Sequence, residues 1–143
     1  MTKMNDRLYS VIEDVIVRKH CFEICSDDVY TYSVVEVTFG IPIERITEIR
    51  VRRYQVGETN DIIYADTVDI KDNFFDINEK SNGIYISTDK LGYGKSTKST
   101  KYYLSVCALY RDKTENICHS GYTDTISVVT PDANVYDKIF KEE

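Results

Sequence analysis

Apolar and polar residues alternate with a period of two along most of the chain from residue 29 onward. This is the pattern of β-strands that bury one face and expose the other. Gly, Pro, Asn and Asp separate the alternating stretches and supply turn chemistry between them. The predicted strands are Val29–Phe39, Ile46–Val56, Ile62–Ile70, Gly83–Thr88, Lys101–Tyr110 and Glu115–Thr130, the last interrupted near Gly121. Several short strands with regular turn signals indicate an all-β sandwich or barrel.

The strongest row of candidate core residues lies in Lys101–Tyr110. Its even positions are all apolar or aromatic: Tyr102, Leu104, Val106, Ala108 and Tyr110. A second row, the odd positions of Val29–Phe39, ends on Val37 and Phe39. Because strand side chains alternate between faces, we expect a core between two sheets. Its predicted members are Tyr102, Leu104, Val106, Val37 and Phe39.

Two extensions flank the predicted sandwich, which spans residues 29–130. Residues 1–28 contain Leu8–Lys19 and His20–Cys25, which have the pattern of one or two added strands. Residues 131–143 place apolar side chains at helical spacing: Val135, Tyr136, Ile139 and Phe140. Because an isolated helix of this length is only marginally stable in water, this tail is expected to dock on its own sandwich or on a neighbouring subunit. The neighbour is favoured, because the body already has enough strands to close its core.

The composition fits one folded domain. A chain of 143 residues is long enough for its own hydrophobic core, and 42% hydrophobic residues with only 2 prolines exclude a disordered chain. The formal net charge of −6 repels a phosphate backbone, so no nucleic-acid partner is expected. Two small basic groups are interpreted as solvated charges: Lys95, Lys98 and Lys101, and Arg50, Arg52 and Arg53.

The expected location follows from what the sequence lacks. No stretch approaches the ~20 apolar residues of a membrane helix, and the first residues do not have the pattern of a signal peptide. We therefore expect a protein that is made in the cytoplasm and either stays there or leaves by lysis, with no membrane partner. Cytoplasmic reductants keep cysteines as thiols, which is the state expected for Cys21, Cys25, Cys107 and Cys118.

Two short motifs resemble ligand sites but fail in detail. Gly92–Thr97 contains Gly-Lys-Ser, as phosphate-binding loops do, but it leads into a strand where such a loop requires a helix. The acidic run from Asp76 to Glu79 resembles part of a calcium loop, but Lys80 occupies a position that needs an oxygen ligand. The first stretch is interpreted as a loop between strands and the second as an acidic turn.

The cysteines and histidines do not make a convincing metal or catalytic site. In an extended strand, Cys21 and Cys25 would lie ~13 Å apart, too far for one zinc ion. A four-residue loop from Arg111 to Thr114 would place Cys107 opposite Cys118, which are expected to be neighbouring reduced thiols. The 2 histidines are far apart in sequence, and no nucleophile motif is present. We expect no cofactor, no metal and no enzymatic activity.

One stretch resembles a known family. Tyr102–Leu109 reads Tyr-Tyr-Leu-Ser-Val-Cys-Ala-Leu, which is similar to the sixth strand of a fibronectin type III domain. Ile49–Tyr54 resembles the third strand of that family. The second strand would hold Val35, Val37 and Phe39. The resemblance covers Tyr30–Thr130 and implies an immunoglobulin-like antiparallel β-sandwich, with Tyr102 as its corner tyrosine.

The chain departs from the fibronectin type III pattern in two respects. The tryptophan of the second strand is missing, with Phe39 the residue expected to fill its place, and the usual proline-rich first strand is absent. An immunoglobulin-like relative and a jelly-roll fragment are therefore alternatives.

The residues that alternate with the core row form a candidate interface. If Leu104 and Val106 point inward, the residues between them point outward, and the third strand adds two arginines to that face. Tyr and Arg are enriched at binding hot spots. The predicted interface comprises Arg50, Arg52, Tyr103, Cys107 and Leu109 of this face with Val135, Tyr136, Ile139 and Phe140 of the tail. The alternative is that one extension covers this face within the same chain.

These patterns predict a non-enzymatic structural or assembly protein whose partners are copies of itself and other proteins of an assembly. Sandwiches of this kind serve in tailed bacteriophages as capsid decoration, collar, ring and tail components. The resemblance thus implies a virion protein made in the host cytoplasm, and the richness in Ile, Tyr, Lys, Asn and Asp is consistent with an AT-rich genome such as that of a crAss-like phage. The alternatives are a stand-alone binding module of a bacterial host and an unrecognised enzyme.

Overall fold

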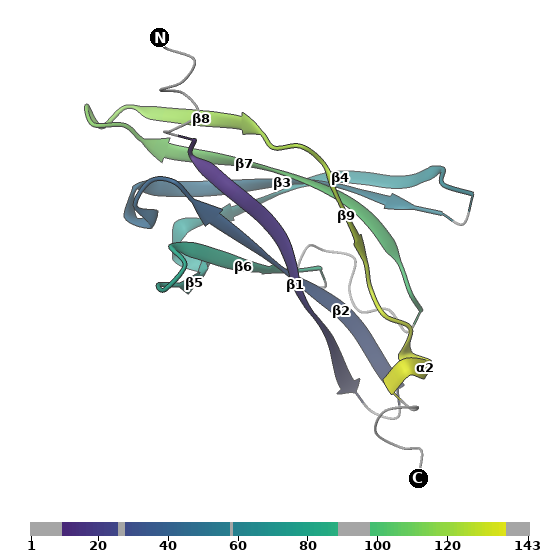
Figure 1. The fold of residues 1–143 in the computed structure, drawn as a ribbon. Helices are drawn as coiled ribbons and strands as arrows, with labels where there is room; N and C mark the ends of the chain where they lie inside the picture. Colours follow the sequence, from purple (N-terminus) through teal and green to yellow (C-terminus); the bar gives the residue numbers. More distant parts are fainter. Residues whose placement is uncertain (1–9, 26–27, 58, 89–97, 137–143) are drawn as a thin grey trace.

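The fold is all-β, as the alternating sequence pattern predicts. A computed structural model describes residues 10–25, 28–57, 59–88 and 98–136 (Figure 1). Its elements are β1 (Ile12–Cys25), β2 (Asp28–Phe39), the 3-10 turn η1 (Ile43–Arg45), β3 (Ile46–Val56), β4 (Ile62–Lys71), the 3-10 turn η2 (Asp72–Phe74), β5 (Asp76–Asn78), β6 (Gly83–Ser87), β7 (Lys101–Arg111), β8 (Ile117–Tyr122), β9 (Ile126–Val129) and α2 (Ala133–Tyr136).

The strands form two antiparallel sheets that face each other as in a β-sandwich (Figure 1). Sheet A has the strand order β1-β2-β6-β5. Sheet B has the order β4-β3-β7-β8, and β9 pairs with the other half of the same edge of β7. The central strands are therefore β2 and β6 in one sheet and β3 and β7 in the other.

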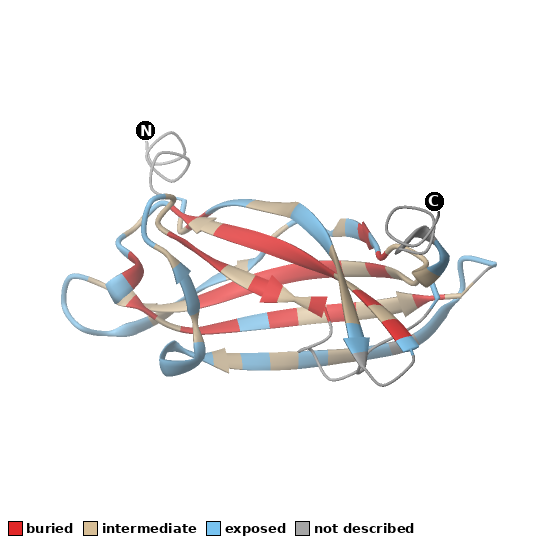
Figure 2. Cartoon of the chain, turned by 90° about the horizontal axis from the view of Figure 1, so that it is seen from below, coloured by how far each residue is buried: buried red, intermediate tan, exposed pale blue. Residues whose placement is uncertain are grey.

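The core lies between the sheets and contains the two rows that the sequence predicts. The five predicted members, Tyr102, Leu104, Val106, Val37 and Phe39, are all buried, which confirms the assignment of faces. In Figure 2, the buried positions fall along strands of both sheets. Ile49 and Val51 of β3 and Ile84 and Ile86 of β6 complete the centre of the core.

The strand-like stretches of the N-terminal extension form one continuous strand. β1 pairs with β2 from Ile12 opposite Phe39 to Cys25 opposite Asp28, so the two strands make a long hairpin. Its N-terminal half belongs to the core, where Ile12 is buried and Val15 and Val17 pack against the cluster. The other half extends past β6, which pairs with β2 only from Val34 to Thr38.

β5 lies where the sequence suggested only an acidic turn. Its three residues pair with Gly83–Tyr85 of β6. The Asn78 side chain donates hydrogen bonds to Glu36 (3.0 Å) and to the Tyr85 hydroxyl (2.8 Å), which ties the new strand to sheet A. Three residues with one apolar side chain are too short for a detectable alternation, which explains why the sequence pattern does not reveal them.

The register of the β7–β8 hairpin differs from the sequence prediction. Cys107 lies opposite Tyr122, and Cys118 lies opposite Tyr110. Since Tyr110 packs against the core, Cys118 shares the inner face of the sheet while Cys107 belongs to the outer face. The prediction that the two thiols are directly paired is wrong.

The loop of this hairpin accounts for the altered register. Its five residues run from Asp112 to Asn116, one more than predicted. Oδ1 of Asp112 accepts hydrogen bonds from the backbone N–H of Thr114 (2.8 Å) and Asn116 (2.9 Å), while Glu115 adopts a positive φ of 66°. An aspartate that folds the backbone back onto its own carboxylate is a common turn device, and here it lengthens the loop.

The described part of the C-terminal tail is a single helical turn, α2. This turn lies beside the beginning of β2 of the same chain (Figure 1). Ile139 and Phe140, and the loop Gly92–Thr97, fall outside the described residues. Among the described residues, no helix has the length and apolar character required to cross a membrane.

Candidate interaction surface

The arginine and tyrosine side chains predicted to share one face do so on the outer side of sheet B. The register places Arg50 opposite Cys107 and Arg52 opposite Ser105, two residues after Tyr103. These positions alternate with the core positions of β3 and β7. The outer face of sheet B comprises Glu48, Arg50, Arg52, Asp69, Lys71, Tyr103, Leu109 and Tyr122.

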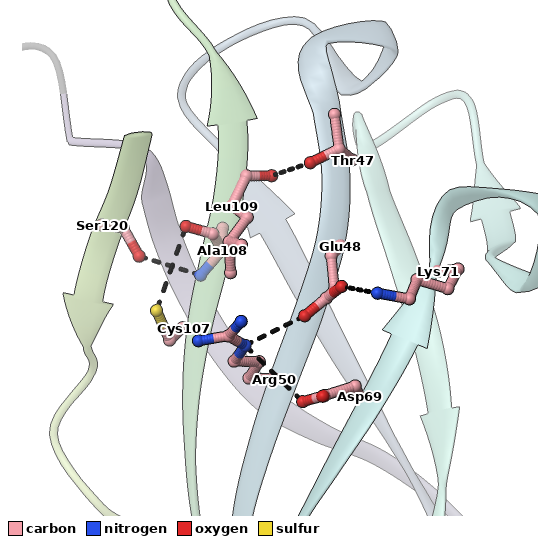
Figure 3. A network of polar contacts seen from close by, with 9 residues as sticks. All are labelled: Thr47, Glu48, Arg50, Asp69, Lys71, Cys107, Ala108, Leu109 and Ser120. Atoms are coloured by element: carbon pink, nitrogen blue, oxygen red, sulfur yellow. Dashed lines mark hydrogen bonds and ion pairs between the residues drawn. The ribbon is translucent and has the colours of Figure 1, made fainter. Parts of the chain in front are cut away.

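Glu48 is the centre of the polar network on this face (Figure 3). Its carboxylate accepts hydrogen bonds from Nε of Arg50 (2.9 Å) and from Nζ of Lys71, although Glu48 itself is buried. Arg50 also lies 3.6 Å from Oδ1 of Asp69. The hydrogen bond from Lys71, followed by that from Arg50, lowers the pKa of Glu48 despite the desolvation that raises it. The carboxylate is therefore charged at neutral pH and held between two cations.

A stacked pair covers the middle of the face. The guanidinium of Arg52 lies 3.8 Å from the centre of the Tyr122 ring, a cation–π contact. Arg52 is on β3 and Tyr122 is on β8, so the stack crosses the intervening strand β7. Cys107, which lies opposite Tyr122 in the pairing of β7 with β8, is only 4% exposed. Cys107 is thus a buried member of the predicted interface, whereas Arg50 is exposed and Arg52, Tyr103 and Leu109 are half-buried.

An irregularity in β8 brings Tyr122 over this position. The pairing of β7 with β8 shifts register between Cys107 and Leu109. At this irregularity, side-chain hydroxyl oxygens accept hydrogen bonds from backbone N–H groups of β7. The N–H of Ala108 donates to Ser120 (2.9 Å), as Figure 3 shows, and the N–H of Val106 donates to Thr123 (3.0 Å). Gly121 adopts φ 75°, a conformation that favours glycine, and it redirects the strand.

A second buried glutamate stabilises the outer side of sheet A. Glu36 accepts hydrogen bonds from Arg18 (2.7 Å), Asn78 (3.0 Å) and Ser81 (2.6 Å). The hydrogen bond from Ser81, and then those from Arg18 and Asn78, lowers the pKa of Glu36 against the effect of burial. The strand pattern alone does not reveal this cluster, because Ser81 and Asn78 come from loop and edge segments distant in sequence.

Arg53, interpreted from the sequence as a solvated charge, belongs to the core face. Its side chain has 0% exposure and forms two hydrogen bonds with Asp66 of β4, of 3.2 Å from Nε and 2.9 Å from Nη2. The guanidinium also lies 5.9 Å from the centre of the Tyr102 ring. The sequence did contain one signal: Asp66 lies in the same row as the apolar Val68 and Ile70, and a carboxylate on a core face requires a polar partner.

The two halves of the predicted interface lie in different places. Val135 and Tyr136 belong to α2, which lies beside β2 in sheet A, and β1 is itself the edge of sheet A. Within the described residues, then, neither α2 nor β1 covers the outer face of sheet B.

The described residues do not bring potential metal ligands together. Among them, no group of three or more His, Cys, Asp and Glu side chains is placed to hold an ion. Cys21, Cys107 and Cys118 are free thiols. Burial, followed by the Asp112 carboxylate 3.6 Å away, raises the pKa of Cys118. Comparison of the chain with models of known protein families, with curated proteins and with solved structures gives no match.

Proposed function

We propose that this protein is a non-enzymatic structural or assembly protein with an immunoglobulin-like fold. It binds other proteins through the outer face of sheet B. The assembly that it joins is a bacteriophage virion. The binding surface carries this proposal. It gathers Arg50, Arg52, Tyr103 and Tyr122 on one broad sheet face that the described extensions leave open.

The strand order supports the immunoglobulin-like part of the proposal. In that fold, one sheet has the order A-B-E-D, the other contains C, F and G, and an added strand C′ lies beside C. Numbering the strands β1 to β8 in chain order as A, B, C, C′, D, E, F and G gives the same two sheets, with β9 continuing G. The stretches that resemble fibronectin strands are β2, β3 and β7, in positions B, C and F.

The chemistry of the face supports protein binding. Its charged side chains are already held by each other, since Glu48 binds Arg50 and Lys71 and the Arg52 guanidinium stacks on Tyr122. Side chains ordered before binding lose less conformational entropy when a partner covers them. Half-buried Tyr103 and Leu109 add apolar area beside this polar network, the mixture typical of interfaces that form and dissociate.

Particle composition tests the virion part. Phage particles purified through a density gradient should contain this protein at a constant ratio to the major capsid protein, measured by quantitative mass spectrometry. Recovery of the protein only in the soluble fraction of the lysate, with none in intact particles, would contradict the proposal.

Surface variants test the binding part. The double variant Arg52→Ala/Tyr103→Ala should lose incorporation into particles while it keeps a cooperative unfolding transition. The matched control is Tyr30→Ala, which removes a comparably half-buried tyrosine from the outer side of sheet A. Equal incorporation of both variants would show that the outer face of sheet B is not the binding surface.

A further inference from the structure

Asn82 ties the turn between β5 and β6 to the segment that follows β2. Its Nδ2 donates hydrogen bonds to the backbone carbonyls of Phe39 (3.1 Å) and Ile41 (2.7 Å). Its Oδ1 accepts one from the backbone N–H of Ile43 (3.1 Å). The backbone carbonyl of Asn82 accepts a further hydrogen bond from the N–H of Phe39 (3.1 Å). One amide side chain thus uses both its donor and its acceptor atoms on a single stretch of backbone, residues 39–43.

The fold requires both residues of the pair Asn82–Gly83. Asn82 has a φ of 54°, in the left-handed region that asparagine enters more readily than most residues with a side chain. Gly83 is buried, and a Cβ atom at its position would lie 2.5 Å from the carbonyl oxygen of Val37. Replacement of Asn82 loses its hydrogen bonds, and replacement of Gly83 forces β6 away from β2. The fold therefore keeps the asparagine and the glycine side by side.

Asparagine followed by glycine is also a chemically labile pair. The backbone nitrogen of the glycine can attack Cγ of the asparagine, because glycine has no side chain to shield it. The new N–Cγ bond closes a five-membered succinimide ring, the Cγ–Nδ2 bond breaks, and the side-chain nitrogen leaves as ammonia with the proton of the backbone nitrogen. Water then opens the ring at either carbonyl, which yields aspartate or isoaspartate. Of all the asparagines in the chain, only Asn82 precedes a glycine.

The hydrogen bonds of Asn82 oppose this reaction in the folded chain. Attack requires Cγ to turn toward the backbone nitrogen of Gly83, whereas the amide is held by residues 39–43. Gly83 belongs to β6, where it pairs with Thr38 of β2 and with Asn78 of β5. Both reacting groups are therefore fixed until the turn opens. Local unfolding of this kind costs less free energy than global unfolding, so it occurs in the native protein.

We propose that Asn82 is a modification site, where deamidation is blocked in the folded chain and proceeds when the turn between β5 and β6 opens. The change is permanent. An aspartate at this position has no N–H group for the carbonyls of Phe39 and Ile41, and it sets a negative charge against them. An isoaspartate adds one carbon atom to the backbone, which displaces β6 from its register with β2, where Ile84 lies opposite Val37. The site thus converts a transient opening into a lasting loss of the turn.

The test compares the folded full chain with the same chain unfolded in guanidinium chloride, both kept at mildly alkaline pH. Peptide mapping by chromatography and mass spectrometry follows the formation of aspartate and isoaspartate. Asn82 should react about tenfold or more faster in the unfolded chain, because the folded chain reaches the reactive conformation only when the turn opens. Asn73 and Asn116, which precede Phe74 and Ile117, are internal controls and should stay unmodified over the same period. Equal rates in the two forms, or no reaction at Asn82 in the unfolded chain, would overturn the proposal.

Ser81→Ala tests whether opening of the turn sets the rate. The Ser81 hydroxyl donates a 2.6 Å hydrogen bond to Glu36, which fixes the turn to β2. The folded variant should therefore deamidate at Asn82 severalfold faster than the folded unmodified protein. The matched control is Ser99→Ala, which removes a hydroxyl that donates a hydrogen bond of similar length (2.7 Å) to the carbonyl of Thr130. A rate for Ser81→Ala no higher than that for Ser99→Ala would contradict the proposal.

Asn82→Asp imitates one product of the reaction. Chemical denaturation should show that it lowers the ratio of folded to unfolded chains about tenfold or more, whereas Asn73→Asp, at an exposed position, should change this ratio little. Equal stability of Asn82→Asp and the unmodified protein would overturn the claim that the change is permanent. The turn belongs to sheet A and the proposed binding surface to the outer face of sheet B, so a failure here is distinct from a failure of the proposed function.

Discussion

At the scale of single residues, the sequence identifies apolar core positions and misses the buried charges. The alternation in β2 and β7 predicts Val37, Leu104 and Val106 as core, because apolar burial follows directly from the period of two. A charged residue gives no such signal, since its burial depends on a partner elsewhere. Glu36 is buried only because Ser81 and Asn78 reach it from another part of the chain.

The two buried glutamates should make stability depend on acidity. The pKa values of Glu36 and Glu48 are lowered from about 4.5 in the folded state, so folding favours their charged forms. Their contribution is present above that value and is lost as the pH falls below it through the folded-state pKa. We expect the free energy of unfolding, measured by urea denaturation at a series of pH values, to decline steeply below about pH 4.5.

The double variant Glu36→Gln/Glu48→Gln is the control for this prediction. It should be less stable than the unmodified protein at neutral pH and should lose less stability on acidification. An identical decline in both proteins would show that other carboxylates account for the acid sensitivity.

At the scale of elements, the sequence predicts strands well and pairing poorly. The predicted stretch Ile46–Val56 coincides with β3, because apolar alternation and flanking turn residues mark its ends. The register of the β7–β8 hairpin could not be predicted, since it depends on the Asp112 turn and on the irregularity at Gly121. A different loop length changes which residues meet across a hairpin. The position of the candidate surface is therefore predictable, but the Arg52–Tyr122 stack is not.

The stack should protect Cys107 from reagents. In a background where Cys21, Cys25 and Cys118 are replaced by serine, Cys107 should react slowly with a small maleimide in the folded protein. Tyr122→Ala should accelerate labelling, because it opens the cover over the thiol, and should cost about 0.5–1 kcal/mol of stability through the lost cation–π contact. Labelling is followed by mass spectrometry, and stability by chemical denaturation.

Tyr103→Ala serves as the comparison for this labelling experiment, because Tyr103 shares the outer face, where Nζ of Lys101 lies 5.1 Å from the centre of its ring, and is not a member of the Arg52–Tyr122 pair. It should leave the labelling rate unchanged. Rapid labelling of the unmodified protein would show that the stack does not close over the thiol.

At the scale of the whole molecule, the all-β architecture follows from the sequence, while the assignment of strands to two sheets does not. β3 pairs with β7 and β2 pairs with β6, and in the sequence three strands lie between the two members of each pair. Local alternation carries no information about such distant partners. The position of α2 beside β2 was equally hidden, because helical spacing indicates an apolar stripe without indicating the surface that it contacts.

Removal of residues 131–143 should loosen the end of the β1–β2 hairpin. α2 lies beside the beginning of β2, where this hairpin extends past β6 and has the least support. We expect faster amide hydrogen exchange in residues 28–33 of the truncated chain, measured by mass spectrometry, and little change in β3 and β7. Unchanged exchange at residues 28–33, together with a loss of self-association, would show instead that the tail docks on a neighbouring subunit.

The pairing of β3 with β7 has a kinetic consequence. The β1–β2 and β3–β4 hairpins connect neighbours in sequence and can form early. Val51 of β3 can pair with Val106 of β7 only after the intervening segment, which contains β4, β5 and β6, has folded back to place β7 beside β3. Closing so long a loop costs entropy before any core contact is gained. Chains dominated by such distant pairings fold in about milliseconds to seconds, far more slowly than helical bundles. During that interval, the apolar rows of β2 and β7 are open to solvent, so a newly made chain is most vulnerable to aggregation before its central strands meet.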